Sequence, residues 1–198
     1  MRRNRIGVFL DRDGTLNEEK DYVRTPDELQ MITGAAQAVR KLNDLGLVTC
    51  VISNQSGVAR GYLSEEDLAG IHAKLTSELA RGGARLDAIY YCPHHPAAGK
   101  ESYNIECDCR KPKPGMLLQG EREFGIDLTR SFVVGDSIVD MQAAAAVGAG
   151  SVLVLTGYGP STLATSRERE VKIDKVAEDI TEAVDYIEQS IKENTKAK

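Results

Sequence analysis

The sequence places two pairs of aspartates directly after short apolar segments. Asp11 and Asp13 follow one such segment, and Asp136 and Asp140 follow another. Carboxylates that share one pocket repel each other, so a cation must offset their charge. A hard divalent ion such as Mg²⁺ suits a site made of oxygen ligands. We therefore expect a magnesium site where the fold brings these aspartates together.

A hydroxyl and an ammonium group complete a set that could handle a phosphoryl group. Ser53 comes after a further apolar segment, and Lys111 stands ahead of a predicted helix. Lysine supplies the positive charge that phosphoryl oxygens need, and serine adds a hydrogen bond. One aspartate would attack the phosphorus as a nucleophile while another moves the proton. Each motif alone also fits a turn, a helix cap or a solvated charge, but four in order favour catalysis.

A second group of residues has the composition of a structural metal site. Cys92 and His94 are followed by Cys107 and Cys109, which together provide four soft ligands for tetrahedral zinc. Four protein ligands leave no open position, so such a zinc would be structural. Free thiols or a disulfide are the alternative, and a disulfide suits an oxidising compartment, of which the sequence gives no sign. The spacing favours His94 over His95 without settling the choice.

Regular elements must position these groups, and the apolar pattern predicts them. Five apolar runs, most without alternation, are typical of strands buried on both faces of a parallel sheet. Helical spacing separates them, which predicts an α/β fold with a doubly wound parallel sheet and right-handed crossovers. The predicted strands are 6–10, 48–52, 86–91, 131–134 and 151–155. The predicted helices cover about 35–45, 64–79, 116–124, 136–148 and 174–194.

The composition bounds the class of protein. The chain has 198 residues, of which 41% are hydrophobic, and a net charge of −5, which predicts one globular domain over 1–198. The acidic balance argues against nucleic acid as a partner. No apolar run approaches the length that spans a bilayer, so we expect no membrane association and a cytoplasmic location. A monomer is the expected state, with 92–110 as a small zinc-loop insert.

The aspartate motifs resemble the signature of the haloacid dehalogenase-like phosphohydrolase superfamily. Asp-Arg-Asp-Gly-Thr at 11–15 and Gly-Asp-Ser-Ile-Val-Asp at 135–140 stand in the order of that signature, with a serine and a lysine between them. The resemblance implies a Rossmann-like fold, with Asp11 as the nucleophile that forms an aspartyl-phosphate. It implies that Asp13 protonates the leaving alcohol and then activates water. It also implies Mg²⁺ bound by Asp11, the Asp13 backbone carbonyl and Asp136.

The same resemblance assigns the remaining polar groups. Ser53 and Lys111 would hold the transferring phosphoryl group. Asp140 would support the site, either by helping the metal or by orienting Lys111.

The cysteine-rich loop narrows the resemblance. Cys-Pro-His-His-Pro at 92–96, Cys-Arg-Lys-Pro-Lys-Pro-Gly-Met at 109–116 and Ser-Asn-Gln-Ser-Gly at 53–57 are similar to motifs of one family. It contains the D-glycero-D-manno-heptose 1,7-bisphosphate 7-phosphatases and the histidinol-phosphatases. The resemblance implies removal of the 7-phosphate from a heptose bisphosphate, a small phosphorylated sugar used for lipopolysaccharide-core or glycoprotein-heptose precursors. A histidinol-phosphate phosphatase is the alternative within this family.

The substrate pocket should be open. The intervals from Asp11 to Ser53 and from Ser53 to Lys111 are too short for a large cap domain, so loops must shape the pocket. Arg110 is the candidate for a second phosphate, because its guanidinium fork matches phosphate geometry. A basic residue at position 137 would have strengthened that assignment. The residues expected to contact the substrate are Glu19, Asp21, Asn54, Gln55, Ser56, Arg110 and Ser137.

Two other classes share part of this chemistry. A phosphate-sensing, receiver-like module also carries an acidic pocket, a hydroxyl residue and a lysine, but it does not need a second aspartate as a proton shuttle. A phosphatase acting on nucleic-acid ends would use the same reaction, and the acidic charge without an aromatic and basic patch disfavours it.

Overall fold

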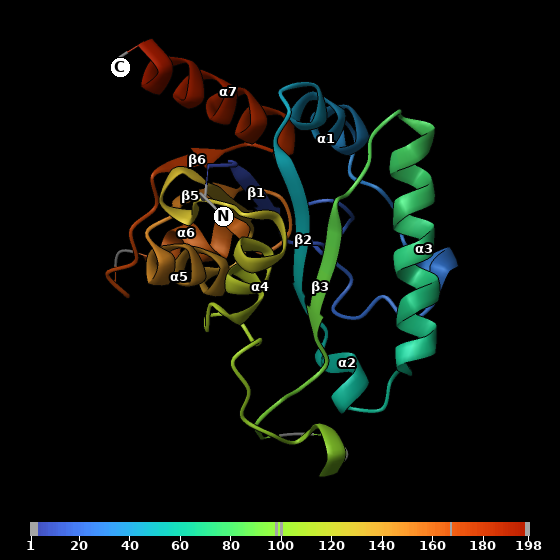
Figure 1. Cartoon of the computed structure of the whole chain (residues 1–198). Coiled ribbons are helices and arrows are strands. Elements are labelled where there is room, and N and C mark those ends of the chain that lie inside the picture. The colour runs from blue at the N-terminus through green and yellow to red at the C-terminus, as the bar shows by residue number, and fades with distance from the viewer. Residues whose placement is uncertain (1–3, 98, 100, 167, 197–198) are drawn as a thin grey trace.

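The computed structural model describes residues 4–97, 99, 101–166 and 168–196, and its centre is one parallel sheet. The strand order is β3-β2-β1-β4-β5-β6, and every neighbouring pair is parallel. β2 and β3 follow on one side of β1, and β4, β5 and β6 follow on its other side, as in a doubly wound sheet (Figure 1). The strands are β1 Gly7–Leu10, β2 Val48–Asn54, β3 Ala88–Cys92, β4 Phe132–Gly135, β5 Gly150–Val154 and β6 Lys175–Ala177.

Helices cover both faces of this sheet. Apolar residues of α1, α3 and α7 pack with Val8 and Leu10 on one face, whereas α4 and α5 pack with Phe9 on the other. The alternation of β1 side chains between two cores explains why its sequence is apolar without interruption. The helices are α1 Ala35–Asp44, α2 Ser56–Ala59, α3 Glu65–Arg81, α4 Gly115–Phe124, α5 Ile138–Val147, α6 Gly159–Ser166 and α7 Ile180–Lys196.

The sequence predicted the fold class and five of the strands, and the structure confirms them. It missed β6, and the C-terminal helix predicted from about residue 174 begins at Ile180 instead. Residues 175–177 extend alongside β5 because Val176 and Ala177 can pair there with Leu153 and Val154. The short helices α2 and α6 were also not predicted. In the part of the chain that the structure describes, no helix is both long and apolar enough to cross a bilayer.

Among its described residues, the long connection between β3 and α4 has little regular structure apart from the 3₁₀ segment Glu101–Tyr103. Figure 1 shows this connection leaving the carboxyl edge of the sheet on the side where α2 lies. A hydrogen-bonded tie fixes it to the start of α3, because the hydroxyls of Tyr91 and Tyr103 both donate to the Glu65 carboxylate at 2.7 Å.

The start of α3 gives a test of local stability. Ser64 Oγ accepts a hydrogen bond from Asp67 N–H at 3.1 Å, and the Asp67 carboxylate accepts one from Ser64 N–H at 2.8 Å. Ser64→Ala removes this cap, and we expect it to lower the free energy of unfolding in urea by about 1 kcal/mol. Ser77→Ala, at an exposed position within the same helix, is the matched control. Equal stability of the two variants would contradict the capping role.

Candidate active site and metal-ligating cluster

A polar cavity of about 470 Å³ opens at the carboxyl ends of the parallel strands. Asp11 follows β1, Ser53 lies near the end of β2, and Asp136 follows β4. Strands that run parallel end at one edge, so residues far apart in the sequence meet there. The residues that line the cavity are Asp11, Asp13, Glu19, Asp21, Ser53, Asn54, Arg110, Lys111, Pro112, Asp136, Ser137, Val139 and Tyr158.

The ammonium group of Lys111 lies at the base of this cavity. Its Nζ is 3.0 Å from Asp11 Oδ1 and 2.6 Å from Asp140 Oδ1, and it donates to the Ile52 carbonyl at 2.8 Å. Lys111 is only 3% exposed and Asp140 is fully buried. The carboxylates raise the pKa of Lys111 against the effect of burial, so the ammonium remains charged.

Negative charge exceeds positive charge at this centre. Carboxylate oxygens of Asp11, Asp136 and Asp140 lie within 4.8 Å of one another. Burial first, and then the charge of Asp140, raise the pKa of Asp11 well above its ordinary value, while burial raises the pKa of Asp136 to about 7. A divalent cation would offset this repulsion, and the all-oxygen donor set suits Mg²⁺.

Two glycines allow the chain to approach Asp136. A Cβ on Gly14 or Gly157 would lie about 2 Å from Asp136 Oδ2, which no side chain can accommodate. Both residues also have positive φ values, of 74° and 53°. The Asp136 carboxylate is therefore enclosed by backbone, and the N–H of Tyr158 donates to its Oδ2 at 2.7 Å.

The Asp13 carboxylate is surrounded by hydrogen-bond donors. Arg12 donates to it from Nε at 3.1 Å and from Nη2 at 2.9 and 2.8 Å. Asn17 and Gln55 each donate to it at 2.9 Å, and Gln55 Nε2 also lies 2.7 Å from Ser53 Oγ. Although burial alone would raise the pKa of Asp13, the Arg12 charge and these hydrogen bonds hold it below the ordinary value. The carboxylate is thus ionised and fixed at the cavity wall.

Arg12 and its neighbour His72 are residues that sequence reasoning missed. The Arg12 side chain is 1% exposed, and its Nη1 lies 3.4 Å from His72 Nε2. Burial and the Arg12 charge lower the pKa of His72 to about 4, so the neutral imidazole can accept this hydrogen bond. The contact joins residues 60 positions apart, and no local pattern marks it.

The expected substrate residues at and after the end of β2 do not all face the cavity. Asn54 lines the cavity, but its amide donates to the Lys111 carbonyl and accepts from the Lys111 N–H, both at 3.0 Å. Gln55 and Ser56 are not among the described residues that line the cavity. Asn54 thus fixes the backbone of Lys111, and Gln55 contacts Asp13 and Ser53.

The other expected substrate residues lie around the cavity mouth. Glu19 and Asp21 line it, as do Arg110 and Ser137. Arg110 Nη1 also donates to the His94 carbonyl at 3.1 Å, which directs the guanidinium along the cysteine-rich loop. Ser137 precedes α5, where its N–H donates to Asp140 Oδ2 at 3.1 Å. The cavity lining therefore contains both acidic and basic side chains.

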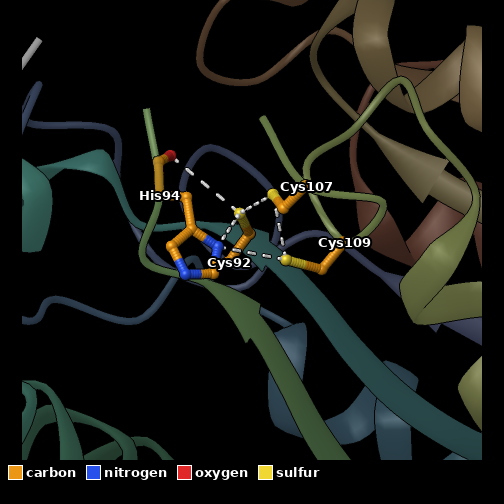
Figure 2. Close-up of side chains that lie close together, drawn as sticks. All are labelled: Cys92, His94, Cys107 and Cys109. Atoms are coloured by element: carbon orange, nitrogen blue, oxygen red, sulfur yellow. Dashed lines mark hydrogen bonds between the residues drawn. The ribbon is translucent and has the colours of Figure 1, made fainter. Parts of the chain in front are cut away.

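The cysteines and the histidine of the loop meet as a compact cluster. Figure 2 shows that Cys92, His94, Cys107 and Cys109 point toward one another from the two ends of the loop. Cys107 Sγ is 3.5 Å from Cys92 Sγ and 3.2 Å from Cys109 Sγ. His94 Nδ1 is 3.8 Å from Cys92 Sγ and 3.5 Å from Cys109 Sγ.

Four ligand atoms this close together could surround one metal ion, although the two sulfur–sulfur distances are shorter than the edges of a zinc tetrahedron. Zinc–sulfur bonds of about 2.3 Å place two sulfur ligands about 3.8 Å apart. A disulfide would need sulfurs about 2.0 Å apart, and all three thiols are free. His95 lies outside the cluster, because its Nδ1 accepts from the Ala97 N–H at 3.2 Å. The cluster could therefore hold a metal through His94 Nδ1 and three sulfurs.

The doubly wound sheet with an aspartate and lysine centre at its carboxyl edge defines a haloacid dehalogenase-type hydrolase. The HAD-hydrolase-like family matches residues 108–183. The D-glycero-beta-D-manno-heptose-1,7-bisphosphate 7-phosphatase of Photorhabdus laumondii is 48% identical over 156 residues, which are 78% of this chain and 83% of the relative. The D-glycero-D-manno-heptose-1,7-bisphosphate 7-phosphatase of Thermosynechococcus vestitus is 43% identical over 187 residues, with shares of 92% and 95%.

A solved structure supports the same grouping. The D,D-heptose 1,7-bisphosphate phosphatase from B. bronchiseptica, in complex with magnesium and phosphate, superimposes with a TM-score of 0.83 at 38% identity. The similarity covers 93% of this chain and 99% of that one. The chain belongs to the haloacid dehalogenase-like hydrolases, in the family of the heptose-bisphosphate phosphatases.

The pairing of Arg12 with Asp13 predicts a pH-dependent loss of stability. Arg12→Met leaves the Asp13 carboxylate without its cation, and we expect the free energy of unfolding in urea to fall by about 3 kcal/mol at pH 7. The folded-state pKa of Asp13 is depressed, so the pair contributes its full stability above the unfolded pKa of about 4 and loses it as the pH falls from there through the lower folded pKa. The difference from the wild type should therefore shrink as the pH falls below about 4.

Arg122→Met, at an exposed position on α4, is the matched control. It should change the stability by less than about 0.5 kcal/mol at either pH. A penalty for Arg12→Met that stays constant from neutral to acid pH would show that Asp13 is not its partner in solution.

Proposed function

We propose that this protein is a phosphatase that removes the 7-phosphate of D-glycero-D-manno-heptose 1,7-bisphosphate and releases heptose 1-phosphate. The proposal rests on the observation that Asp11, Asp13, Lys111 and Arg110 all line the same cavity. The first three groups suit phosphoryl transfer, and the guanidinium suits a second phosphate. Relatives at 43–48% identity that are named for this reaction support it. The β-anomer is the first substrate to test, since several relatives carry it in their names.

The proposed reaction has two steps. Asp11 attacks the phosphorus of the 7-phosphate and the bond to the sugar oxygen breaks. Asp13, which is ionised in the free protein, must take up a proton in the substrate complex and then gives it to the leaving oxygen. Water then attacks the aspartyl-phosphate while Asp13 takes a proton from it, which releases inorganic phosphate and restores Asp11. Ser53 and Lys111 hold the phosphoryl oxygens during both steps.

A magnesium ion fits the proposed centre. Asp11, the backbone carbonyl of Asp13 and Asp136 would hold it. When bound, Mg²⁺ supplies positive charge to the phosphoryl oxygens and offsets the repulsion between them and the carboxylates. Asp140 acts on Lys111, which it contacts at 2.6 Å, rather than on the substrate.

We also propose that Cys92, His94, Cys107 and Cys109 bind a structural zinc ion. The distances between their ligand atoms and the absence of a disulfide among these thiols support it. Lys111 follows Cys109 by two positions, so the zinc would fix the segment that carries the phosphate-binding lysine. Free thiols of this kind need a reducing compartment, and we propose a monomer that acts in the cytoplasm.

A histidinol-phosphate phosphatase is the second candidate, and one observation favours it. Glu19 and Asp21 place carboxylates on the cavity wall, where a cationic amine would be attracted. Arg110, which also lines the cavity, would repel that amine and has no second phosphate to bind in such a substrate. A receiver-like module does not agree with the relatives, which are phosphatases by name.

The substrate assignment predicts a preference that kinetics can measure. The value of kcat/KM should be higher for the heptose bisphosphate than for histidinol phosphate, and Arg110→Met should lower it mainly for the bisphosphate. Both anomers and histidinol phosphate are compared on one enzyme preparation. A higher kcat/KM for histidinol phosphate would replace the proposed function with the second candidate.

The nucleophile and the proton shuttle predict two distinct defects. Asp11→Asn should abolish turnover, because an amide cannot form the aspartyl-phosphate. Asp13→Asn should slow turnover by about 100- to 10,000-fold, which is the usual contribution of general acid–base catalysis. Release of inorganic phosphate measures both, and Asp44→Asn on the exposed end of α1 is the control. A near-normal rate in either active-site variant would refute the mechanism.

The cysteine cluster predicts a metal content. Protein purified without added zinc should contain about one equivalent of it by elemental analysis. Cys107→Ala should lose this zinc, whereas Cys50→Ala should keep it, because Cys50 is a fully buried core residue. Wild-type protein without zinc, or equal zinc in the two variants, would contradict the proposal.

A further inference from the structure

Tyr158 connects two parts of the cavity wall that the sequence keeps far apart. Its backbone N–H donates to Asp136 Oδ2 at 2.7 Å, and its phenol hydroxyl donates to Asp21 Oδ1 at 2.9 Å. Both Tyr158 and Asp21 line the cavity. One residue therefore contacts the carboxylate proposed for the metal through its backbone, and a carboxylate at the cavity mouth through its side chain.

The hydrogen bond leaves one oxygen of Asp21 available. The hydroxyl proton of Tyr158 is used on Oδ1, and no other hydrogen bond or ion pair to the Asp21 carboxylate is found among the residues described. The backbone of Asp21 has a φ of 57°, in the left-handed region, which aspartate adopts more readily than most other non-glycine residues.

The side chains around Tyr158 suit the hydroxyl groups of a sugar phosphate better than its phosphate groups. Glu19 and Asp21 carry negative charge, so a phosphate group would be repelled there. A carboxylate oxygen accepts hydrogen bonds from hydroxyl groups, and the face of a tyrosine ring covers the apolar C–H groups of a sugar. Arg110 offers a cation that suits the second phosphate.

We propose that Tyr158 is a positioning residue that holds Asp21 as the acceptor for a hydroxyl of the substrate, and so favours polyhydroxylated phosphate esters over simple ones. This inference rests on the proposed function, since it concerns the same cavity. It adds a residue from the segment after β5, which sequence reasoning left without a role.

Tyr158→Phe tests the hydroxyl alone. The variant keeps the backbone bond to Asp136, and the Tyr158 side chain is 46% exposed, so removal of its hydroxyl should leave the fold intact. We expect KM for the heptose bisphosphate to rise about five- to tenfold, the size of one ordinary hydrogen bond, because Asp21 itself remains and only its positioning is lost, with kcat within about twofold of the wild type. KM for p-nitrophenyl phosphate, which offers no sugar hydroxyls, should not change.

Two further variants test whether Tyr158 acts through Asp21 or through a general effect on the protein. Asp21→Asn should raise KM for the same substrate, and the double variant should be no worse than the more impaired single variant, because both remove one interaction. Tyr62→Phe is the control, since Tyr62 is equally exposed at 46% and does not line the cavity.

Three outcomes would overturn the inference. An unchanged KM for the bisphosphate in Tyr158→Phe would overturn it while the proposed function stands. An equal fall in kcat for both substrates would show that Tyr158 acts on the reaction centre instead. A wild-type enzyme with no preference for the heptose bisphosphate over p-nitrophenyl phosphate would overturn the proposed function and this inference together.

Discussion

The Lys111 ammonium is almost entirely removed from water and is held by three oxygen atoms, from Asp11, Asp140 and the Ile52 carbonyl. A buried cation is tolerated only where such partners replace its hydration, and the removal of one partner leaves the others uncompensated. The geometry of Asp11 therefore depends on a residue from a distant segment. Asn54 fixes that segment to the end of β2 through two hydrogen bonds to the Lys111 backbone.

The position of Lys111 depends in turn on the cysteine-rich loop that precedes it. The described residues between 92 and 110 have little regular structure and few buried apolar side chains, so the hydrophobic effect contributes little to their order. The cluster of Cys92, Cys107, Cys109 and His94 joins the two ends of the loop directly ahead of Lys111. Metal ligation would thus stabilise the folded loop, as the burial of apolar side chains stabilises the rest of the fold.

The parts predictable from the sequence are those set by local pattern. Uninterrupted apolar runs defined five strands, and the parallel order then required Asp11, Ser53 and Asp136 to meet at one edge. The strand at 175–177 was not predicted, because three residues that begin with a lysine are too few to show a hydrophobic pattern. The contact between Arg12 and His72 could not be predicted from the sequence either, since it depends on how α3 packs against the loop after β1.

The distribution of charge in the cavity bears on the substrate more than any single contact. The cavity lining includes five carboxylates against two cations, Arg110 and Lys111, and Lys111 is already paired with Asp11 and Asp140. A doubly phosphorylated ligand would meet net repulsion unless a divalent ion offset the carboxylates at one end. Magnesium is therefore expected to promote binding of the bisphosphate as well as its hydrolysis. Arg110 alone would then carry the second phosphate, and Glu19 and Asp21 would accept hydrogen bonds from the sugar hydroxyls.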